Sequence, residues 1–273
     1  MQDMASQFWR SGCRWTAGEL AWATLTSTGE QEVCFFDRGW AWRRGDFAVI
    51  LASTSAAGII ADWTPRLVQV RDGDEVLRSA LDEEGYREVV NAPYDLDMRL
   101  AVTDAALPVP PGGYLVRSAD NSDDLLGVHR TAWRPADLPF APGSAPPFDP
   151  QATSPLTAPI LTAVQSAWPY QPDLHIVAQA PNGSLAASCI AWLDPATGVA
   201  AIEPLGVRRG HRRRGLAGAL CLYAAQLVRR AGGDELVIHP RGDAAYPAPR
   251  AAYQRCGFTV AGRTRTYARP SDP

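Results

Sequence analysis

The sequence of 273 residues contains no lysine, so arginine supplies all 26 of its Lys or Arg positions. This absence excludes a lysine nucleophile or a Schiff-base lysine as the centre of any chemistry. Together with abundant alanine and proline, it is typical of a GC-rich bacterial genome. Any cationic binding site in this chain must therefore be built from arginine.

Cysteine is scarce as well, with five residues that are odd in number and widely spaced. No C-x-x-C pair occurs, so neither a disulfide framework nor a zinc site is indicated, and a reducing cytosol is favoured. The histidines are isolated from one another: His129, His175, His211 and His239. No carboxylate cluster accompanies them, so we expect no metal.

Long apolar runs are also missing. No stretch approaches the roughly 20 apolar residues that a membrane span needs. The N-terminus, MQDMASQFWRSG, lacks the basic-then-apolar pattern of a secretory signal. We therefore expect a cytoplasmic protein with no membrane partner. Its apolar content of 46% is that of a globular chain, long enough for one large domain or two ordinary ones.

Charge is unevenly distributed along the chain. Residues 1–111 hold 10 Arg against 17 Asp and Glu, whereas residues 112–273 hold 16 Arg against 12. The halves therefore net to −7 and +4 in a chain whose formal charge is −3. A Pro- and Gly-rich stretch, LPVPPGG at 107–113, lies where the balance changes. The sequence predicts two domains, 1–111 and 112–273.

The second half has a clear order of predicted elements. Hairpin signals such as PNGS and PATG separate its middle strands, which indicates an antiparallel meander. A proline-rich segment at 134–155 is too broken for regular structure. The predicted elements are a strand at 113–118, a helix at 122–133, strands at 173–180, 185–194 and 199–207, a helix from 216, a strand at 235–240, a helix at 248–256 and a strand at 257–269.

The first half echoes this order. It predicts a hairpin meander at 32–50, a strand at 66–70, a helix at 75–86 and closing strands at 87–90 and 94–102. Aligning Gly85-Tyr86 with Gly257-Phe258 superposes the ends of two helices. The first half has no counterpart of the arginine- and glycine-rich stretch that follows the second meander. It reads as a degenerate repeat.

That stretch, GVRRGHRRRGLAGAL at 206–220, lies between a predicted strand and a predicted helix. A helix N-terminus leaves backbone N–H groups unpaired and attracts anions, and Gly215, Ala217 and Gly218 let a ligand approach closely. Arginines 212–214 add charge. The pattern predicts a pyrophosphate cradle. It is not a Walker loop, because Leu216 and Ala217 stand where Lys and Ser/Thr belong, and it is not GxGxxG.

Two segments resemble the signatures of the GNAT acyl-CoA N-acyltransferases. RRRGLA at 212–217 is similar to [QR]xxGx[GA], and YQRCGF at 253–258 is similar to a helix ending in Tyr-x-x-x-Gly-Phe. The resemblance covers about residues 112–270 well and 1–111 faintly. It implies an α/β (α+β) fold of two GNAT-like domains in tandem, each a mixed, mostly antiparallel twisted sheet flanked by helices, with a degenerate N-terminal copy.

The resemblance also implies site residues. Backbone groups at Leu205, Gly206 and Val207 would pair with the pantetheine arm, and a backbone N–H there would stabilise the oxyanion. The pyrophosphate would be held at Arg212, Arg213, Arg214, Gly215, Leu216, Ala217 and Gly218. Tyr253 would be the general acid.

Glu203 is the first choice as general base, because alternation along the strand places it on the face of Leu205, and His239 is the second choice. Three other roles stay open: core packing of the Tyr253 ring, an arginine partner for Glu203, and a plain strand-end position for His239.

The acceptor side departs from the family's pattern. The family often has Asn seven residues before the tyrosine, where this chain has Tyr246. Tyr246 either replaces that contact, faces the acceptor or belongs to a loop insertion. Trp168 and Tyr170 precede the meander, where such proteins position the acceptor, although Trp168 equally fits a core role.

The resemblance thus implies an N-acetyltransferase that moves an acetyl or other acyl group from acetyl-CoA, or a related acyl-CoA, to a primary amine by direct attack in a ternary complex. The alternative is a non-catalytic acyl-CoA-binding sensor. A nucleic-acid-binding protein is a distant third, because the sequence pI of 5.8 is below neutrality and no reading helix is recognisable. The acceptor is a small-molecule or peptide amine, and a monomer or a homodimer is expected.

Overall fold

The computed structural model describes residues 2–8, 15–36, 39–52, 55–120, 123–144, 152 and 154–269. The helices are α1 (Gln2–Phe8), α2 (Ala17–Thr26), α3 (Ala57–Trp63), α4 (Glu75–Glu83), α5 (Leu125–Ala132), α6 (Ala158–Ser166), α7 (Leu216–Arg230) and α8 (Pro247–Arg255). The strands are β1 (Gln31–Phe36), β2 (Gly39–Arg44), β3 (Phe47–Ala52), β4 (Leu67–Arg71), β5 (Arg87–Glu88), β6 (Leu96–Ala101), β7 (Leu115–Ser118), β8 (His175–Gln179), β9 (Leu185–Asp194), β10 (Val199–Val207), β11 (Glu235–Ile238) and β12 (Thr259–Ala268). Over these ranges no helix is long and apolar enough to cross a bilayer.

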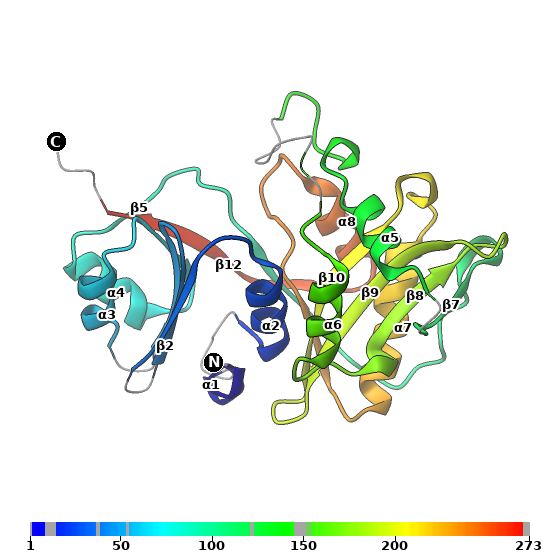
Figure 1. Cartoon of the computed structure of the whole chain (residues 1–273), viewed down its shortest axis with the longest axis horizontal. Helices are drawn as coiled ribbons and strands as arrows, with labels where there is room; N and C mark the ends of the chain where they lie inside the picture. Colours follow the sequence, from blue (N-terminus) through cyan, green and yellow to red (C-terminus); the bar gives the residue numbers. More distant parts are fainter. Residues whose placement is uncertain are drawn as a thin grey trace.

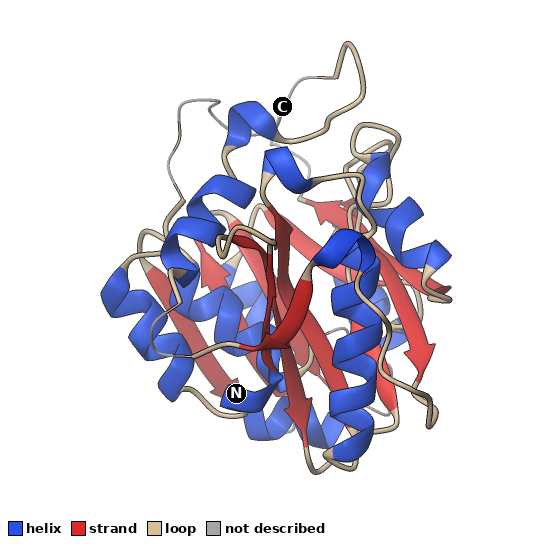
Figure 2. Cartoon of the chain, turned by 90° about the vertical axis from the view of Figure 1, so that its right-hand side faces the viewer, coloured by secondary structure: helices blue, strands red, loops and turns tan. Residues whose placement is uncertain are grey.

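The strands form one continuous sheet. Its order is β1-β2-β3-β4-β12-β6-β11-β10-β9-β8-β7, and β5 pairs beside it with β12. The pair β3–β4 and the pair β10–β11 are parallel, whereas the other strand pairs of the described chain are antiparallel. Helices lie on both sides of the strands (Figure 2). The predicted fold class, a mixed and mostly antiparallel sheet flanked by helices, is confirmed.

The two halves of the chain repeat one order of elements. The meander β1–β3 is followed by α3, the parallel strand β4 and α4, just as β8–β10 is followed by α7, the parallel strand β11 and α8. Helices α4 and α8 both end at a glycine with positive φ, +81° at Gly85 and +94° at Gly257. A buried aromatic ring, Tyr86 or Phe258, follows each glycine. The predicted repeat of element order is confirmed, whereas the loss of a cofactor site from the first copy stays a prediction.

Each half supplies a strand to the other half. From the first half, β6 pairs with β11 and with residues 259–263 of β12. From the second half, residues 264–268 of β12 pair with β4, and its end also pairs with β5. Figure 1 shows β12, in red, running from one lobe into the other. Neither half completes its sheet alone, and the boundary between residues 111 and 112 stays a prediction.

The sheet is covered differently on its two faces. On one face, α7 buries a regular stripe against β9 and β10, of which Leu220 and Val228 are fully buried. Each such side chain contributes about 1.5–3 kcal/mol relative to an exposed position. On the opposite face, α2 and α6 pack around the buried ring of Trp192. Strand β10 therefore lies between α7 on one face and α2 on the other.

The sequence did not predict helices α1, α2, α3 and α6, of which α2 and α6 cover the second half of the sheet around Trp192. In α2 the buried positions are mostly small, and Gly18 lies so close to Trp192 that an added Cβ would be 2.0 Å from the Trp192 Cβ. In α6, Val164 is the buried residue. A close small-residue contact and a single buried valine produce no apolar stripe at helical spacing, which is the signal that sequence patterns offer.

Candidate active site

The site begins where β10 and β11 part. The two strands pair in parallel only over Val199–Ala201 and Glu235–Val237. Beyond this, β10 continues to pair with β9, and its register shifts by one residue between Ile202 and Leu205. Pro204, inside the shift, has no N–H to donate to a ladder. The bulge therefore coincides with a gap on the β11 side.

The loop after β10 leads into the uncapped end of a helix. Gly215, at the N-cap of α7, has φ +79°, a left-handed conformation that suits glycine, and no side chain caps this helix. Arg213 also has a positive φ, +60°. The first-turn N–H groups of α7 are thus left to face a ligand, and the helix dipole favours an anion there.

A cavity of about 1060 Å³ joins the gap to this helix end. Its walls also include α8 and residues of the segment 132–139. The sequence-predicted residues that line it are Glu203, Leu205, Gly206, Val207, Arg212, Arg213, Gly215, Leu216, Ala217, Gly218, His239, Tyr246 and Tyr253. The cavity is at the upper end of the volumes typical of ligand sites.

Three sequence-predicted residues do not line this cavity: Arg214, Trp168 and Tyr170. Trp168 is 41% exposed, and the hydroxyl of Tyr170 lies 3.1 Å from Nδ1 of His175 while its ring packs against Trp192. The acceptor role predicted for Trp168 and Tyr170 therefore has no support from the cavity.

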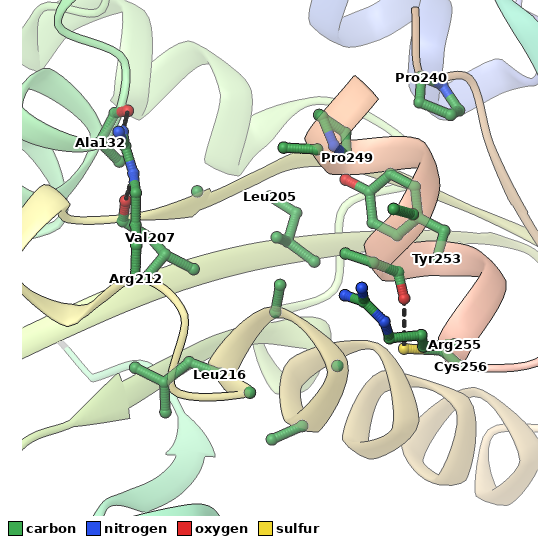
Figure 3. Close-up of a pocket in the computed structure, with 18 of the residues that line it drawn as sticks. Ala132, Leu205, Val207, Arg212, Leu216, Pro240, Pro249, Tyr253, Arg255 and Cys256 are labelled. Atoms are coloured by element: carbon green, nitrogen blue, oxygen red, sulfur yellow. Dashed lines mark hydrogen bonds between the residues drawn. The ribbon is translucent and has the colours of Figure 1, made fainter. Parts of the chain in front are cut away.

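The arginine-rich stretch divides into two kinds of side chain. The Arg212 guanidinium donates to the backbone carbonyls of Val207 (3.0 Å), Ala132 (2.9 Å) and Asp137. Figure 3 shows it reaching from Val207 to Ala132. The sequence predicted that Arg212 binds a phosphate group. Its guanidinium instead donates to three backbone carbonyls and so connects the segment 132–137 to β10.

Other arginines of the stretch are also engaged with that segment or its neighbours. Arg209 pairs with Asp137 at 2.8 Å, and Arg208 lies 3.8 Å from Asp124. Nδ1 of His211 lies 2.8 Å from the Tyr114 hydroxyl. These groups hold the loop rather than present a row of charge to a long polyanion.

Two exposed arginines of the cavity wall make no ion pair with any residue that the structure describes. They are Arg213, in the loop, and Arg255, on α8. Arg255 was not predicted as a site residue. Its only signal in the sequence was its place two residues after Tyr253. The cavity thus offers charge for phosphates from two sides.

Tyr253 projects from α8 towards Leu205 of β10 (Figure 3). Its ring is 7% exposed and lies 6.0 Å from that of Phe258. Burial, together with the nearby Cys221 and Glu203, raises the pKa of Tyr253 well above its usual value. The phenol therefore carries its proton at neutral pH and can donate it into the cavity.

Glu203 is the only carboxylate among the described residues that line the cavity. It lies at the bulge of β10 and is partly buried. Its charge contributes to the raised pKa of Tyr253, so the two side chains share one electrostatic environment. A carboxylate and a protonated phenol at one cavity are a suitable pair for acid and base roles.

His239 is held between two carboxylates from the first half of the chain. Its Nδ1 contacts Oε1 of Glu19, and its Nε2 lies 3.4 Å from Oδ1 of Asp97. Glu19 is itself fixed, because it forms a capping box with Thr16 at the start of α2. Nδ1 is thus engaged by Glu19, and Nε2 is buried with no hydrogen-bond partner among the described residues, so neither ring nitrogen is open to an amine in the cavity.

The segment after α5 closes the cavity with aromatic rings. Trp133 stacks on His129 with ring centroids 5.1 Å apart, and it lies directly over Gly206 of β10. Phe140 stacks on Tyr246 at 4.8 Å. Tyr246 thus joins the loop after β11 to the segment after α5. Trp133 was not predicted as a cavity residue.

Gly206 should tolerate no side chain. A Cβ added there would lie 1.6 Å from Cζ3 of Trp133. We expect Gly206→Ala to lower the free energy of unfolding by about 1–3 kcal/mol, the usual cost of overpacking. Chemical denaturation measures this, and adding Trp133→Ala should restore part of the loss. Gly210→Ala is the matched control, since a Cβ there meets nothing within 4 Å; an equal loss in both variants would contradict the close contact.

Comparisons with known proteins show a similarity to one family over part of the chain. Residues 145–258 match the model of the acetyltransferase (GNAT) family. A GCN5-related N-acetyltransferase from Sphaerobacter thermophilus has a similar structure, with a TM-score of 0.61, 18% identity, and coverage of 98% of this chain and 91% of that one. No curated protein matches this chain.

Two further solved structures share the fold over nearly the whole chain. A tandem GNAT protein from the clavulanic acid biosynthesis pathway has a TM-score of 0.60 and 14% identity, with coverage of 99% of this chain and 94% of that one. A GNAT-family acetyltransferase from Colwellia psychrerythraea has a TM-score of 0.61 and 11% identity, with coverage of 99% and 97%. At such identities these structures bear on the fold alone.

Proposed function

We propose that the chain is an N-acetyltransferase using acetyl-CoA and a primary amine, because residues 145–258 match the model of the acetyltransferase (GNAT) family. The acetyl group passes directly from thioester to amine while both substrates are bound. The observation that carries the proposal is one cavity that joins parted strands, an uncapped helix start and a buried, protonated tyrosine.

The chemistry of the cavity fits acetyl-CoA. Backbone N–H groups at the start of α7 are positioned for a pyrophosphate, and Gly215, Ala217 and Gly218 leave room for it. The Arg213 and Arg255 side chains add positive charge on either side. The bulged part of β10, Leu205–Val207, has its edge towards the gap open for the pantetheine arm.

The proposed reaction needs one acid and one base. The amine nitrogen attacks the thioester carbonyl, the C–S bond breaks, and the thiolate takes the proton of the Tyr253 hydroxyl. Glu203, directly or through a water, takes the proton that the attacking nitrogen loses. A backbone N–H of Leu205–Val207 would stabilise the negative oxygen of the tetrahedral intermediate, which is commonly a large term in acyl transfer.

Glu203 is the better base of the two sequence candidates. His239 lines the cavity, but Glu19 and Asp97 face its two ring nitrogens. Glu203 is the only carboxylate among the described lining residues and belongs to the strand at which the attack is proposed. We assign His239 a structural role and Glu203 the proton-accepting role.

Replacing Glu203 by Gln should lower kcat by roughly 10²-fold at neutral pH, the lower end of the usual range for a positioned base. The deficit should shrink as pH rises, because an aliphatic ammonium titrates near pH ~10 and more acceptor is then already the free amine. Steady-state rates across pH measure this. His239→Gln is the control for the rival base, and a deficit that appears there but not in Glu203→Gln would reverse the assignment.

The proposed function is tested by titrating acetyl-CoA into the protein by calorimetry and by following free thiol release with a panel of primary amines. Saturable binding and amine-dependent thiol release are expected. Absence of binding to acetyl-CoA and to longer acyl-CoAs would overturn the proposal.

A further inference from the structure

A group of three thiols lies beside the cavity, with one member in its wall, and has no part in the proposed reaction. Cys189 on β9 and Cys221 on α7 are buried, whereas Cys256, directly after α8, is partly exposed and lines the cavity. The three belong to the same core cluster. Cys256 is thus the member that a soluble reagent can reach.

Cys256 lies between the two helices that enclose the proposed cofactor site. Its Sγ donates to the carbonyl of Ala252 at 3.2 Å, and a Cβ added to Gly218 in the first turn of α7 would lie 3.2 Å from the same sulfur. Tyr253 precedes it by three residues and Arg255 is its neighbour (Figure 3). A change at this sulfur acts on both helices.

Cys221 follows Gly218 by three residues on α7, so it lies on the helix face against which the Cys256 sulfur packs. The neighbouring Cys221 thiol and the charge of Arg255 lower the pKa of Cys256, whereas the neighbouring Cys256 thiol and burial raise the pKa of Cys221. A thiol that is more readily ionised and reachable is the one that oxidants attack, and a thiol held beside it can resolve the product.

We propose that Cys256 and Cys221 form a peroxide-sensitive thiol pair that closes the cofactor site when it is oxidised. The Cys256 thiolate attacks hydrogen peroxide, which gives a sulfenic acid and hydroxide. The sulfur of Cys221 then attacks the sulfenic sulfur, forming the disulfide, and the hydroxyl group leaves with the thiol proton as water. The effect on acyl-CoA rests on the proposed function; the disulfide itself does not.

Closing the disulfide changes the shape of the site. An S–S bond of about 2.05 Å is much shorter than any contact between two separate thiols, and it requires the two Cβ atoms to lie about 3.8 Å apart. The end of α8 therefore moves against α7, which takes Arg255 with it and narrows the space beside Gly218. Acetyl-CoA should bind the oxidised protein at least about tenfold more weakly, a loss of about 1.4 kcal/mol. Bound acetyl-CoA should in turn slow the oxidation of Cys256.

The test uses the full chain with Cys13 and Cys34 changed to Ser, so that thiols away from the cavity do not contribute. After treatment with hydrogen peroxide, the intact mass should fall by two hydrogens. Because the chain has no lysine, trypsin cleaves only after arginine, and peptide 215–229 should appear linked to peptide 256–263. Dithiothreitol should reverse both changes. Cys189→Ser is the matched control and should still form the link.

Two variants separate the steps. Cys256→Ser should give no link and no sulfenic acid, whereas Cys221→Ala should leave a sulfenic acid on Cys256 that dimedone traps. No 221–256 link in the parent protein, or an equal link in the Cys256→Ser variant, would overturn the inference.

Calorimetry with acetyl-CoA on reduced and oxidised protein then separates this inference from the proposed function. If the link forms and the reduced protein binds no acyl-CoA, the proposed function fails while the thiol pair stands. If the reduced protein binds acetyl-CoA and peroxide produces the link without weakening that binding, closure of the site is wrong.

Discussion

Replacing Tyr253 by Phe is expected to lower kcat by roughly 10²- to 10⁴-fold, the usual contribution of a positioned general acid. The hydroxyl is buried beside Glu203, and the raised pKa keeps it protonated through neutral pH. Without it the thiolate leaves unprotonated into a largely apolar cavity. The ring itself stays, so packing against Phe258 is preserved. Steady-state kinetics with acetyl-CoA and a responsive amine measure the change.

The affinity for acetyl-CoA separates the acid role from a packing role. An acid that acts only in the transition state leaves the dissociation constant of acetyl-CoA nearly unchanged while kcat falls. The same kinetic measurement tests the alternative of a non-catalytic sensor. Such a protein would bind acetyl-CoA but show no turnover, either before or after the replacement of Tyr253. In the parent enzyme, any decline in kcat from ionisation of Tyr253 should begin only above pH 10, because its pKa lies well above that value. Full activity in Tyr253→Phe would contradict the assignment.

The strands and the cofactor loop were predictable because their signals are local. Hairpin turns delimit β9 and β10, and the predicted limits of both strands, 185–194 and 199–207, are the observed ones. Glycines at 215 and 218 marked the close approach at α7. Both depend on a few adjacent residues, which is the range over which turn chemistry and helix capping act.

The relation between the halves was not predictable in this way. The pattern of β6 indicates a strand, but nothing in it states that its neighbours are β11 and β12, which lie more than a hundred residues away. Pairing between distant strands is decided by the whole fold. The same holds for Glu19, whose partner His239 belongs to the other half. Through such contacts, residues of the first half support His239, which lines the cavity.

The arginine stretch illustrates how structure reassigns residues of one type. Sequence reasoning treated arginines 212–214 as phosphate ligands because they precede a glycine-rich turn. In the fold, the guanidinium of Arg212 donates its hydrogen bonds to backbone carbonyls. Arg255, which no motif marked, lines the cavity and is placed to bind a phosphate. A guanidinium can satisfy carbonyl groups or a phosphate equally well, so only the position of the acceptors decides its role.

Replacing Asp97 by Asn is expected to lower the free energy of unfolding by about 3–5 kcal/mol, because it leaves the largely buried guanidinium of Arg71 without its carboxylate. Asp97, on β6, is 2% exposed. It contacts Arg71 of β4, lies 3.1 Å from Nη2 of Arg99, and lies 3.4 Å from Nε2 of His239. One carboxylate thus joins the first half of the sheet to the end of β11, beside the cavity. Urea denaturation of the two proteins measures the loss.

The exposed pair of Asp104 and Arg229 provides the control for this prediction. Its partners are 83% and 40% exposed, so solvent screens their attraction, and Asp104→Asn should leave the urea midpoint nearly unchanged. Because Asp97 also faces His239, its replacement should disturb the end of β11 and weaken acetyl-CoA binding, whereas Asp104→Asn should not. Equal midpoints for the two variants would show that the buried carboxylate does not hold the halves together. A loss confined to Asp97→Asn would make the first half of the chain a structural support of the cavity.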